Sequence, residues 1–112
     1  MQFESKKSGN VTIVSILESR VDAKIAVDFR DSIADLINSG NHNLVVDLSE
    51  VDFVDSSGLG AIVSSLKILG RKGDMALSGV RPTVMSLFKL TRMDKVFRMF
   101  DDEAEAAKAL AE

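Results

Sequence analysis

Short apolar runs along the chain predict strands. Residues 11–17 (VTIVSIL) alternate apolar and polar positions and are rich in β-branched side chains, which predicts a strand with one buried face. Residues 2–5 are expected to pair with this strand across a turn at residues 6–10. Residues 44–48 (LVVDL) form a continuous apolar run, typical of a strand covered on both sides. We therefore expect that segment in the middle of a sheet.

Longer stretches with apolar residues at helical spacing predict helices. The first follows Asp22, whose side chain is expected to cap it. The second begins near Ser57 or Gly58, and Pro82 opens a third. Acidic residues at 101–103 begin an alanine-rich closing helix. The apolar residues expected to share the core are Ile25, Phe29, Ile33, Leu59, Ile62 and Leu66.

Two more strands, at residues 75–78 and 96–100, are predicted between these helices. Strands that alternate with helices after an opening hairpin predict an α/β fold with a mixed sheet. We expect about five strands, with about four helices packed against them in a single pair of layers. The connections are too short for a second domain, so residues 1–112 are expected to form one domain.

The composition is typical of a globular domain. Of the 112 residues, 46% are apolar and 28% are charged, well above the apolar content of disordered chains. The longest charge-free stretches, residues 36–46 and 56–66, are shorter than the roughly 20 apolar residues of a membrane-spanning helix. The first nine residues lack the apolar segment of a secretory signal. We therefore expect a cytoplasmic protein with no membrane part.

Several chemistries are excluded by residues that the chain lacks. It has no cysteine and a single histidine, His42, which excludes disulfides, thiolate nucleophiles and metal sites that need two imidazoles. We expect no cofactor and no metal. Residues 56–100 carry eight bases and two acids, but the net charge is −3, and the chain has no tryptophan or tyrosine to interleave with a basic track. We expect no nucleic-acid partner.

Candidate chemistry gathers at residues 47–66, where Ser56 and Ser57 lie at a predicted loop-to-helix junction. A serine hydrolase is disfavoured because Val54 and Asp55 stand where the nucleophile elbow needs a glycine two residues before the serine. The candidate base would be His42, which lies in a polar turn and is expected to be a solvated loop residue.

Two further alternatives stay open. Gly58 and Gly60 open the helix after a strand, as in nucleotide-binding folds, but Val63 stands where the dinucleotide fingerprint has a small residue. Asp47 ends the predicted central strand, as does the phospho-accepting aspartate of a receiver domain. A receiver also needs an acid cluster at an early strand end and a lysine after a late strand, and neither is evident.

Residues 54–60 (VDSSGLG) resemble the signature of STAS domains, specifically of the freestanding anti-sigma factor antagonists. The resemblance extends to residues 20–22 (RVD), 44–48 (LVVDL), 81–84 (RPTV) and 90–97. It departs at residues 19–20, where the family often has Gly-Glu or Gly-Asp, and at Arg92, where glycine is common.

The resemblance implies a STAS-type fold and a regulatory switch, not an enzyme. In that family the unphosphorylated domain binds an anti-sigma factor, often a GHKL-type serine kinase, and so frees the sigma factor. The kinase phosphorylates the serine directly after the aspartate, here Ser56, and a PP2C-type phosphatase restores it. STAS subunits of lipid-transport or stress-signalling complexes are the alternative. The implied partner-binding residues are Asp22, Asp55, Ser56, Ser57, Gly58, Leu59, Gly60 and Ser64.

The residues themselves also favour a switch. A serine at a loop-to-helix junction is accessible to a kinase, and the free amides of a helix start favour an anion. A hydroxyl of Ser56 that merely caps the helix would look the same in the sequence. The small residues Gly60, Ala61, Ser64 and Ser65 form one side of the helix, either for close approach of a partner or for close packing within the domain.

Overall fold

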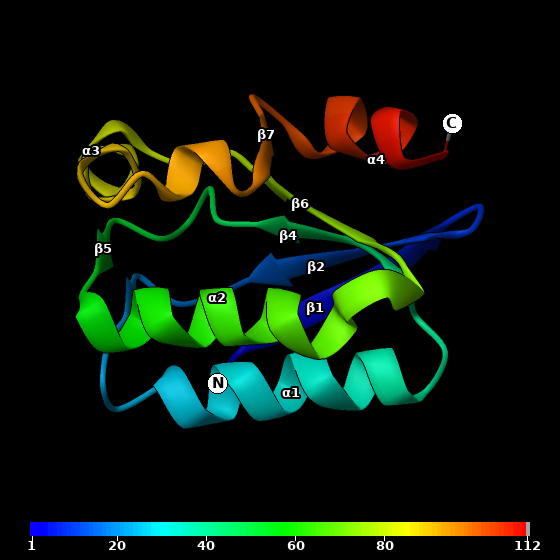
Figure 1. Cartoon of the computed structure of the whole chain (residues 1–112), viewed down its shortest axis with the longest axis horizontal. Coiled ribbons are helices and arrows are strands. Elements are labelled where there is room, and N and C mark those ends of the chain that lie inside the picture. The colour runs from blue at the N-terminus through cyan, green and yellow to red at the C-terminus, as the bar shows by residue number, and fades with distance from the viewer. Residues whose placement is uncertain (112) are drawn as a thin grey trace.

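The computed structural model describes residues 1–111. Five strands form one sheet in the order β1-β2-β4-β6-β7, in which β1 is antiparallel to β2 and all other neighbours are parallel (Figure 1). This arrangement confirms the predicted mixed sheet and places the strand predicted at residues 44–48 at its centre, as β4, one residue earlier along the chain. The strands are β1 Phe3–Ser8, β2 Val11–Ile16, β4 Asn43–Asp47, β6 Asp74–Ser78 and β7 Arg98–Phe100.

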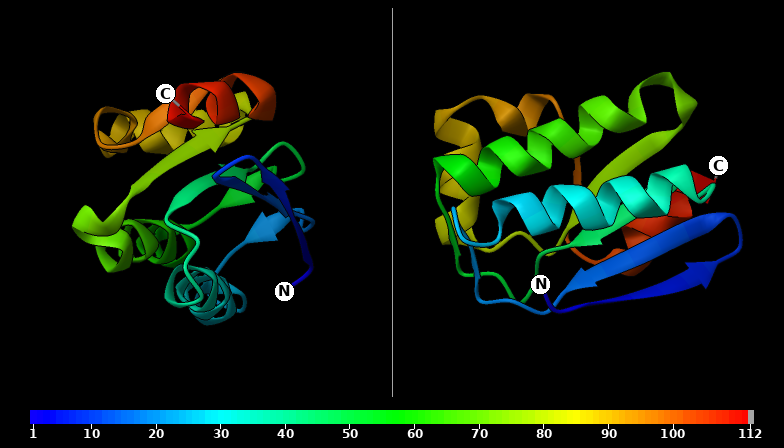
Figure 2. Two further views of the ribbon diagram at one scale, coloured as in Figure 1. Left: turned by 90° about the vertical axis from the view of Figure 1, so that its right-hand side faces the viewer. Right: turned by 90° about the horizontal axis from the view of Figure 1, so that it is seen from below.

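Four α-helices complete the predicted α/β fold, together with short 3-10 turns at Gly70–Lys72 and Met93–Lys95. Helices α1 and α2 lie side by side on one face of the sheet, and α4 lies on the other (Figure 2). The expected single pair of layers is therefore wrong, because helices cover both faces. The helices are α1 Ala26–Asn38, α2 Ser56–Leu69, α3 Pro82–Leu90 and α4 Glu103–Ala111.

The two faces of the sheet are packed differently. The face under α1 and α2 holds the larger core, in which Phe29, Ile33 and Ile62 are almost fully buried. On the other face, Val11 and Ile13 of β2 pack against the alanines of α4. The expectation that β2 has one buried face is therefore wrong, since side chains on both of its faces are buried.

Two local features differ from the sequence-based expectations. Asp22 does not cap α1, because the helix begins only at Ala26 after Ile25; the Asp22 carboxylate accepts from the Lys24 amide in the turn before the helix. Leu66 and Ile25 are only partly buried and pack against the edge of the core. Arg92 has φ +62°, a left-handed conformation that favours glycine, which explains why glycine is common there in the family.

None of the helices in residues 1–111 is long and apolar enough to cross a bilayer.

Candidate functional site

A two-stranded parallel sheet positions the signature segment. It is formed by β3 (Arg20–Val21) and β5 (Phe53–Val54), which bring the segment before α1 beside the segment before α2. The amides of Asp52 and Phe53 both donate to the Ser19 carbonyl, at 2.9 and 3.2 Å. No sequence pattern predicted this sheet, because each strand is only two residues long.

Asp55 caps α2 and joins it to the segment that precedes α1. One carboxylate oxygen accepts from the Gly58 amide at 2.8 Å, and the other accepts from the Ala23 amide at 3.3 Å. The cap of α2 is therefore Asp55, which leaves the Ser56 hydroxyl outside that role. The helix also begins at Ser56, one residue before the predicted start.

Gly58 makes the closest backbone approach at the site. A Cβ atom placed there would lie 1.9 Å from the Val21 carbonyl oxygen, so only glycine lets α2 pack against β3. Gly60 has no neighbour within 4 Å of the corresponding position. The two glycines thus serve different purposes, and Gly58 is explained by close packing rather than by a phosphate cradle.

Ser56 and Ser57 are both exposed at the start of α2 but border different hollows. Ser56 borders an open depression of about 470 Å³ between α2 and α3, and Ser57 borders a smaller one of about 240 Å³ between α2 and α1. Gly60 and Ser64 line both, so they form a low ridge between the two hollows.

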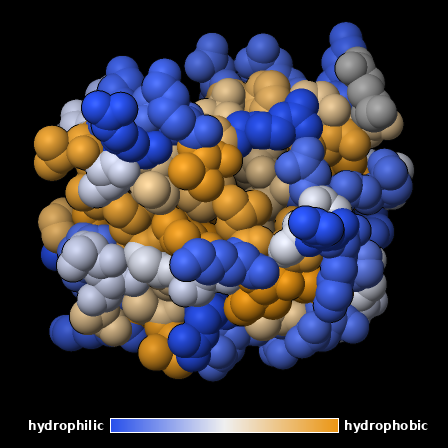
Figure 3. Space-filling view, viewed as in Figure 1, coloured by the Kyte–Doolittle hydropathy of each residue, from blue (hydrophilic) through white to orange (hydrophobic). Residues whose placement is uncertain are grey.

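The larger hollow is apolar at its base and polar at its rim. Figure 3 shows apolar residues gathered between α3 and α2 in this view. Helix α2 contributes Leu59 and Val63, and the opposite wall holds Leu87 and Met93. The place of Met93 depends on a 3-10 turn that no periodic pattern in the sequence indicates.

The small-residue side of α2 is divided between packing and surface. Ala61 and Ser65 are buried, and the Ser65 hydroxyl donates to the Ala61 carbonyl within the helix. Gly60 is exposed and Ser64 is half-buried at the ridge. Close packing within the domain therefore accounts for Ala61 and Ser65 alone.

Asp22 lies near the signature through its contact with Arg20 and its place just after β3. Its carboxylate is 3.5 Å from the Arg20 Nε, and the Arg20 guanidinium stacks over the Phe53 ring at 4.0 Å. Phe53 is 38% exposed, so the stacked Arg20 and Phe53 side chains form an apolar and cationic surface beside residues 19–20, where the chain departs from the family pattern.

The residues considered for a receiver domain and for a serine hydrolase either have hydrogen-bond partners within the domain or lie far from Ser56. Asp47 is buried, and its two carboxylate oxygens accept from the Ser49 amide and the Ser78 hydroxyl at 2.8 and 3.0 Å. His42 precedes the amino end of β4, whereas Ser56 follows the carboxyl end, so they lie at opposite ends of the sheet. Within residues 1–111 no three acidic or histidine side chains cluster as metal ligands.

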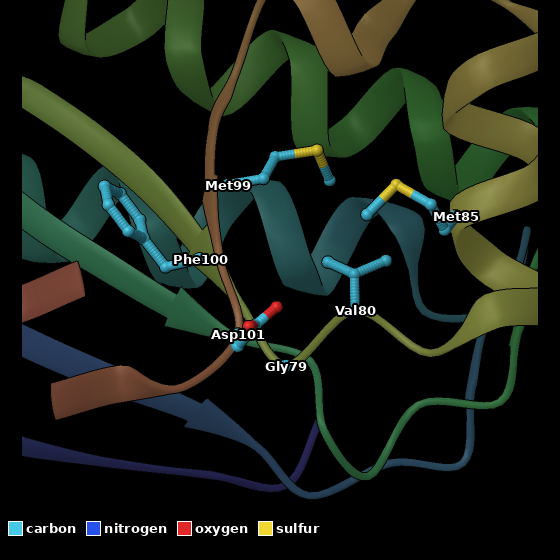
Figure 4. Close-up of a pocket in the computed structure, with 6 residues that line it drawn as sticks. All are labelled: Gly79, Val80, Met85, Met99, Phe100 and Asp101. Atoms are coloured by element: carbon cyan, nitrogen blue, oxygen red, sulfur yellow. The ribbon is translucent and has the colours of Figure 1, made fainter. Parts of the chain in front are cut away.

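A separate hollow of about 250 Å³ lies where β6 and β7 end. The side chains of Met85, Met99 and Val80 converge on it (Figure 4), and Asp101 lines its rim. The signature residues do not line this hollow, so it is a feature distinct from the site at Ser56.

Comparison with known proteins identifies the family. The model of the STAS domain matches residues 2–106, nearly the whole chain. The chain belongs to the STAS domain family. This confirms the resemblance of the signature, and the relatives are anti-sigma factor antagonists, a class of non-enzymatic regulators, as expected.

Three relatives define the relationship. An anti-sigma F factor antagonist from Paenibacillus polymyxa is 35% identical over 69 residues, which are 61% of this chain and 59% of that protein. A crystal structure from Thermotoga maritima, described as a candidate anti-sigma factor antagonist, has TM-score 0.88 and 26% identity and covers 98% of this chain and 95% of that one. Phosphorylated Bacillus SpoIIAA has TM-score 0.72 and 20% identity, covers 96% and 98%, and shares the STAS fold.

The chain thus spans less than two thirds of the Paenibacillus relative's length. The comparisons show that the chain has the STAS fold and is related to anti-sigma factor antagonists. The partner and the regulation of this chain are matters for proposal.

Proposed function

We propose that this STAS domain is a cytoplasmic anti-anti-sigma factor that is switched off by phosphorylation at Ser56. In its unphosphorylated form it binds an anti-sigma factor that is a GHKL-type serine kinase, and so releases the sigma factor. A PP2C-type phosphatase returns it to the binding form. The single observation that carries the proposal is the exposed Ser56 at the rim of the apolar hollow between α2 and α3.

The position of Ser56 suits both modification and partner binding. The hydroxyl is on the first residue of α2, where the helix dipole and free amides stabilise an anion by about 0.3 to 1 kcal/mol at exposed sites. A phosphate there is not expected to unfold the domain. The existence of phosphorylated SpoIIAA, a structure of the same fold, supports this expectation.

The same phosphate would oppose an interface over the hollow. It adds about 1.5 to 2 negative charges, next to the Asp55 carboxylate. Burying an unpaired charge costs several kcal/mol even after relaxation. A loss of about 3 kcal/mol would weaken the affinity on the order of a hundredfold.

The binding test compares serines that share a helix turn but face different hollows. We would titrate the GHKL-type kinase of the same genome with wild type, Ser56→Ala, Ser56→Asp and Ser57→Asp, and record a thermal melt of each. We expect Ser56→Asp to weaken binding about tenfold or more, and Ser57→Asp, with the same added charge beside α1, to weaken it less. Equal affinities for all four proteins would remove Ser56 from the interface.

The modification test identifies the acceptor. With that kinase and ATP, the label should be lost in Ser56→Ala and kept in the matched variant Ser57→Ala. A phosphoester on Ser56 is stable to hydroxylamine, whereas an acyl phosphate on Asp47 is not. A label that survives Ser56→Ala, or that hydroxylamine removes, would contradict the assignment.

A further inference from the structure

Strand β1 forms a free edge of the sheet. Its one strand neighbour is β2, and it is the outermost strand in the views of Figure 2. Its side chains are exposed from Glu4 to Ser8, and β1 pairs with β2 without interruption over all six of its residues. An uninterrupted edge strand of this length is a template for pairing with another chain.

The hydrogen-bond pattern shows which backbone groups of β1 are unused. The Leu17 amide donates to the Gln2 carbonyl at 2.9 Å, in the same register that pairs Glu4 with Ser15. Because hydrogen-bonded pairs alternate along an antiparallel ladder, the even-numbered residues of β1 direct their N–H and C=O groups to β2. Phe3, Ser5 and Lys7 therefore direct theirs to the free edge.

Only certain registers join two such edges about a twofold axis. Residues that lie opposite each other in a sheet have their side chains on the same face, and side chains alternate between faces along a strand. The twofold axis must therefore pass through a residue of β1 and not between two residues. With the axis at Ser5, the two Ser5 residues form a hydrogen-bonded pair, and Phe3 pairs with Lys7 of the second copy. The outward groups of all three residues are then used in both copies, which gives about six hydrogen bonds.

The charges select this same register. With the axis at Ser5, Glu4 lies opposite Lys6 of the second copy, twice, as close non-hydrogen-bonded pairs. Moving the axis to Glu4 or to Lys6 would place two like charges directly opposite each other, which is unfavourable. Lys6 already contacts Glu103 of α4 at 2.7 Å, and this carboxylate raises the pKa of Lys6, so the ammonium stays charged.

We propose that two copies of this chain associate through β1, antiparallel about Ser5, to form one continuous sheet. The occupant of the edge is a second copy because Glu4 and Lys6 make the strand complementary to itself. The contact is confined to one strand from each copy, so the interface is small and the association weak, with dimers expected only at roughly 0.1 to 1 mM. The proposal is independent of the switch at Ser56, which lies on α2.

The first test removes the outward amide at the axis. Sedimentation velocity of the full chain at rising concentration should show wild type shifting from monomer to dimer. Ser5→Pro removes a donor that β2 does not use, and proline is tolerated on an edge strand with its nitrogen facing solvent. We expect it to abolish the shift with little change in the thermal melt. A wild type that stays monomeric at about 1 mM would overturn the proposal, and lysines would then simply protect the edge.

The second test depends on charge alone and stays informative if Ser5→Pro does not fold. Glu4→Lys and Lys6→Glu should each weaken self-association at least tenfold. Mixed with each other, the two variants should associate again, because every cross-pair then joins opposite charges. Lys6→Glu also removes the contact between Lys6 and Glu103 within its own chain, but mixing the two variants does not restore that contact, so it cannot explain renewed association. Failure of the mixture to associate contradicts the register, and a change of association in Ser56→Asp contradicts the independence from the switch.

Discussion

The first two turns of α2 have an inner side that the rest of the chain covers and an outer side that it leaves exposed. On the inner side, Asp55 bonds two amides and Gly58 lies against the Val21 carbonyl. On the outer side, Ser56 and Gly60 are exposed, and apart from the adjoining residues and the backbone of α2 no described atom lies within 4 Å of where a Gly60 Cβ would be. Within one short motif, some residues therefore pack against the rest of the domain and others lie exposed on its surface.

This division explains why the motif is so compact. The Asp55 carboxylate and the Gly58 backbone hold α2 against the segment that contains β3, which fixes the outer residues in place without using the outer side chains. The outer residues are then free for the binding and the modification proposed above. The comparison predicts that inner substitutions change stability and that outer substitutions change binding.

The largest effect is expected for Gly58→Ala. The new methyl group would overlap a backbone carbonyl that β3–β5 pairing holds in place, so α2 or β3 must shift. We expect a loss of about 3 kcal/mol in the free energy of unfolding, in the range of overpacked cores. Denaturant unfolding followed by circular dichroism measures it. A loss below about 0.5 kcal/mol would show that the two segments are not in close contact.

A smaller loss is expected for Asp55→Ala. The substitution leaves the Gly58 and Ala23 amides without their acceptor, which typically costs about 0.5 to 2 kcal/mol for a helix cap. Asp55→Asn is the matched control, because its amide oxygen keeps one acceptor for Gly58. Denaturation curves of the two variants should differ, with the asparagine variant closer to wild type. Identical curves would mean that the cap contributes little.

The order of these elements follows from the sequence more fully than the details of the site do. Residues 44–48 and the helix with Leu59 and Ile62 carry patterns long enough to predict their type and place. The two-residue strands β3 and β5 and the Gly58–Val21 contact depend on segments brought together by tertiary packing, which no local pattern encodes. The place of α4 on the second face could not be predicted either, because its alanines are compatible with exposure as well as with burial.

The smallest effect on stability, and the sharpest test of the outer side, is expected for Gly60→Ala. Glycine inside a helix costs about 0.5 to 1 kcal/mol relative to alanine, and the structure has open space for the methyl group. The variant should therefore be as stable as wild type or slightly more stable. If the ridge between the two hollows is where a partner helix approaches closely, the same methyl group should weaken binding of the kinase while the thermal melt does not fall. Calorimetric titration beside a melt separates the two effects. Unchanged affinity would restrict the interface to the Ser56 side of the ridge, and a marked loss of stability would show that Gly60 belongs with Gly58 on the inner side.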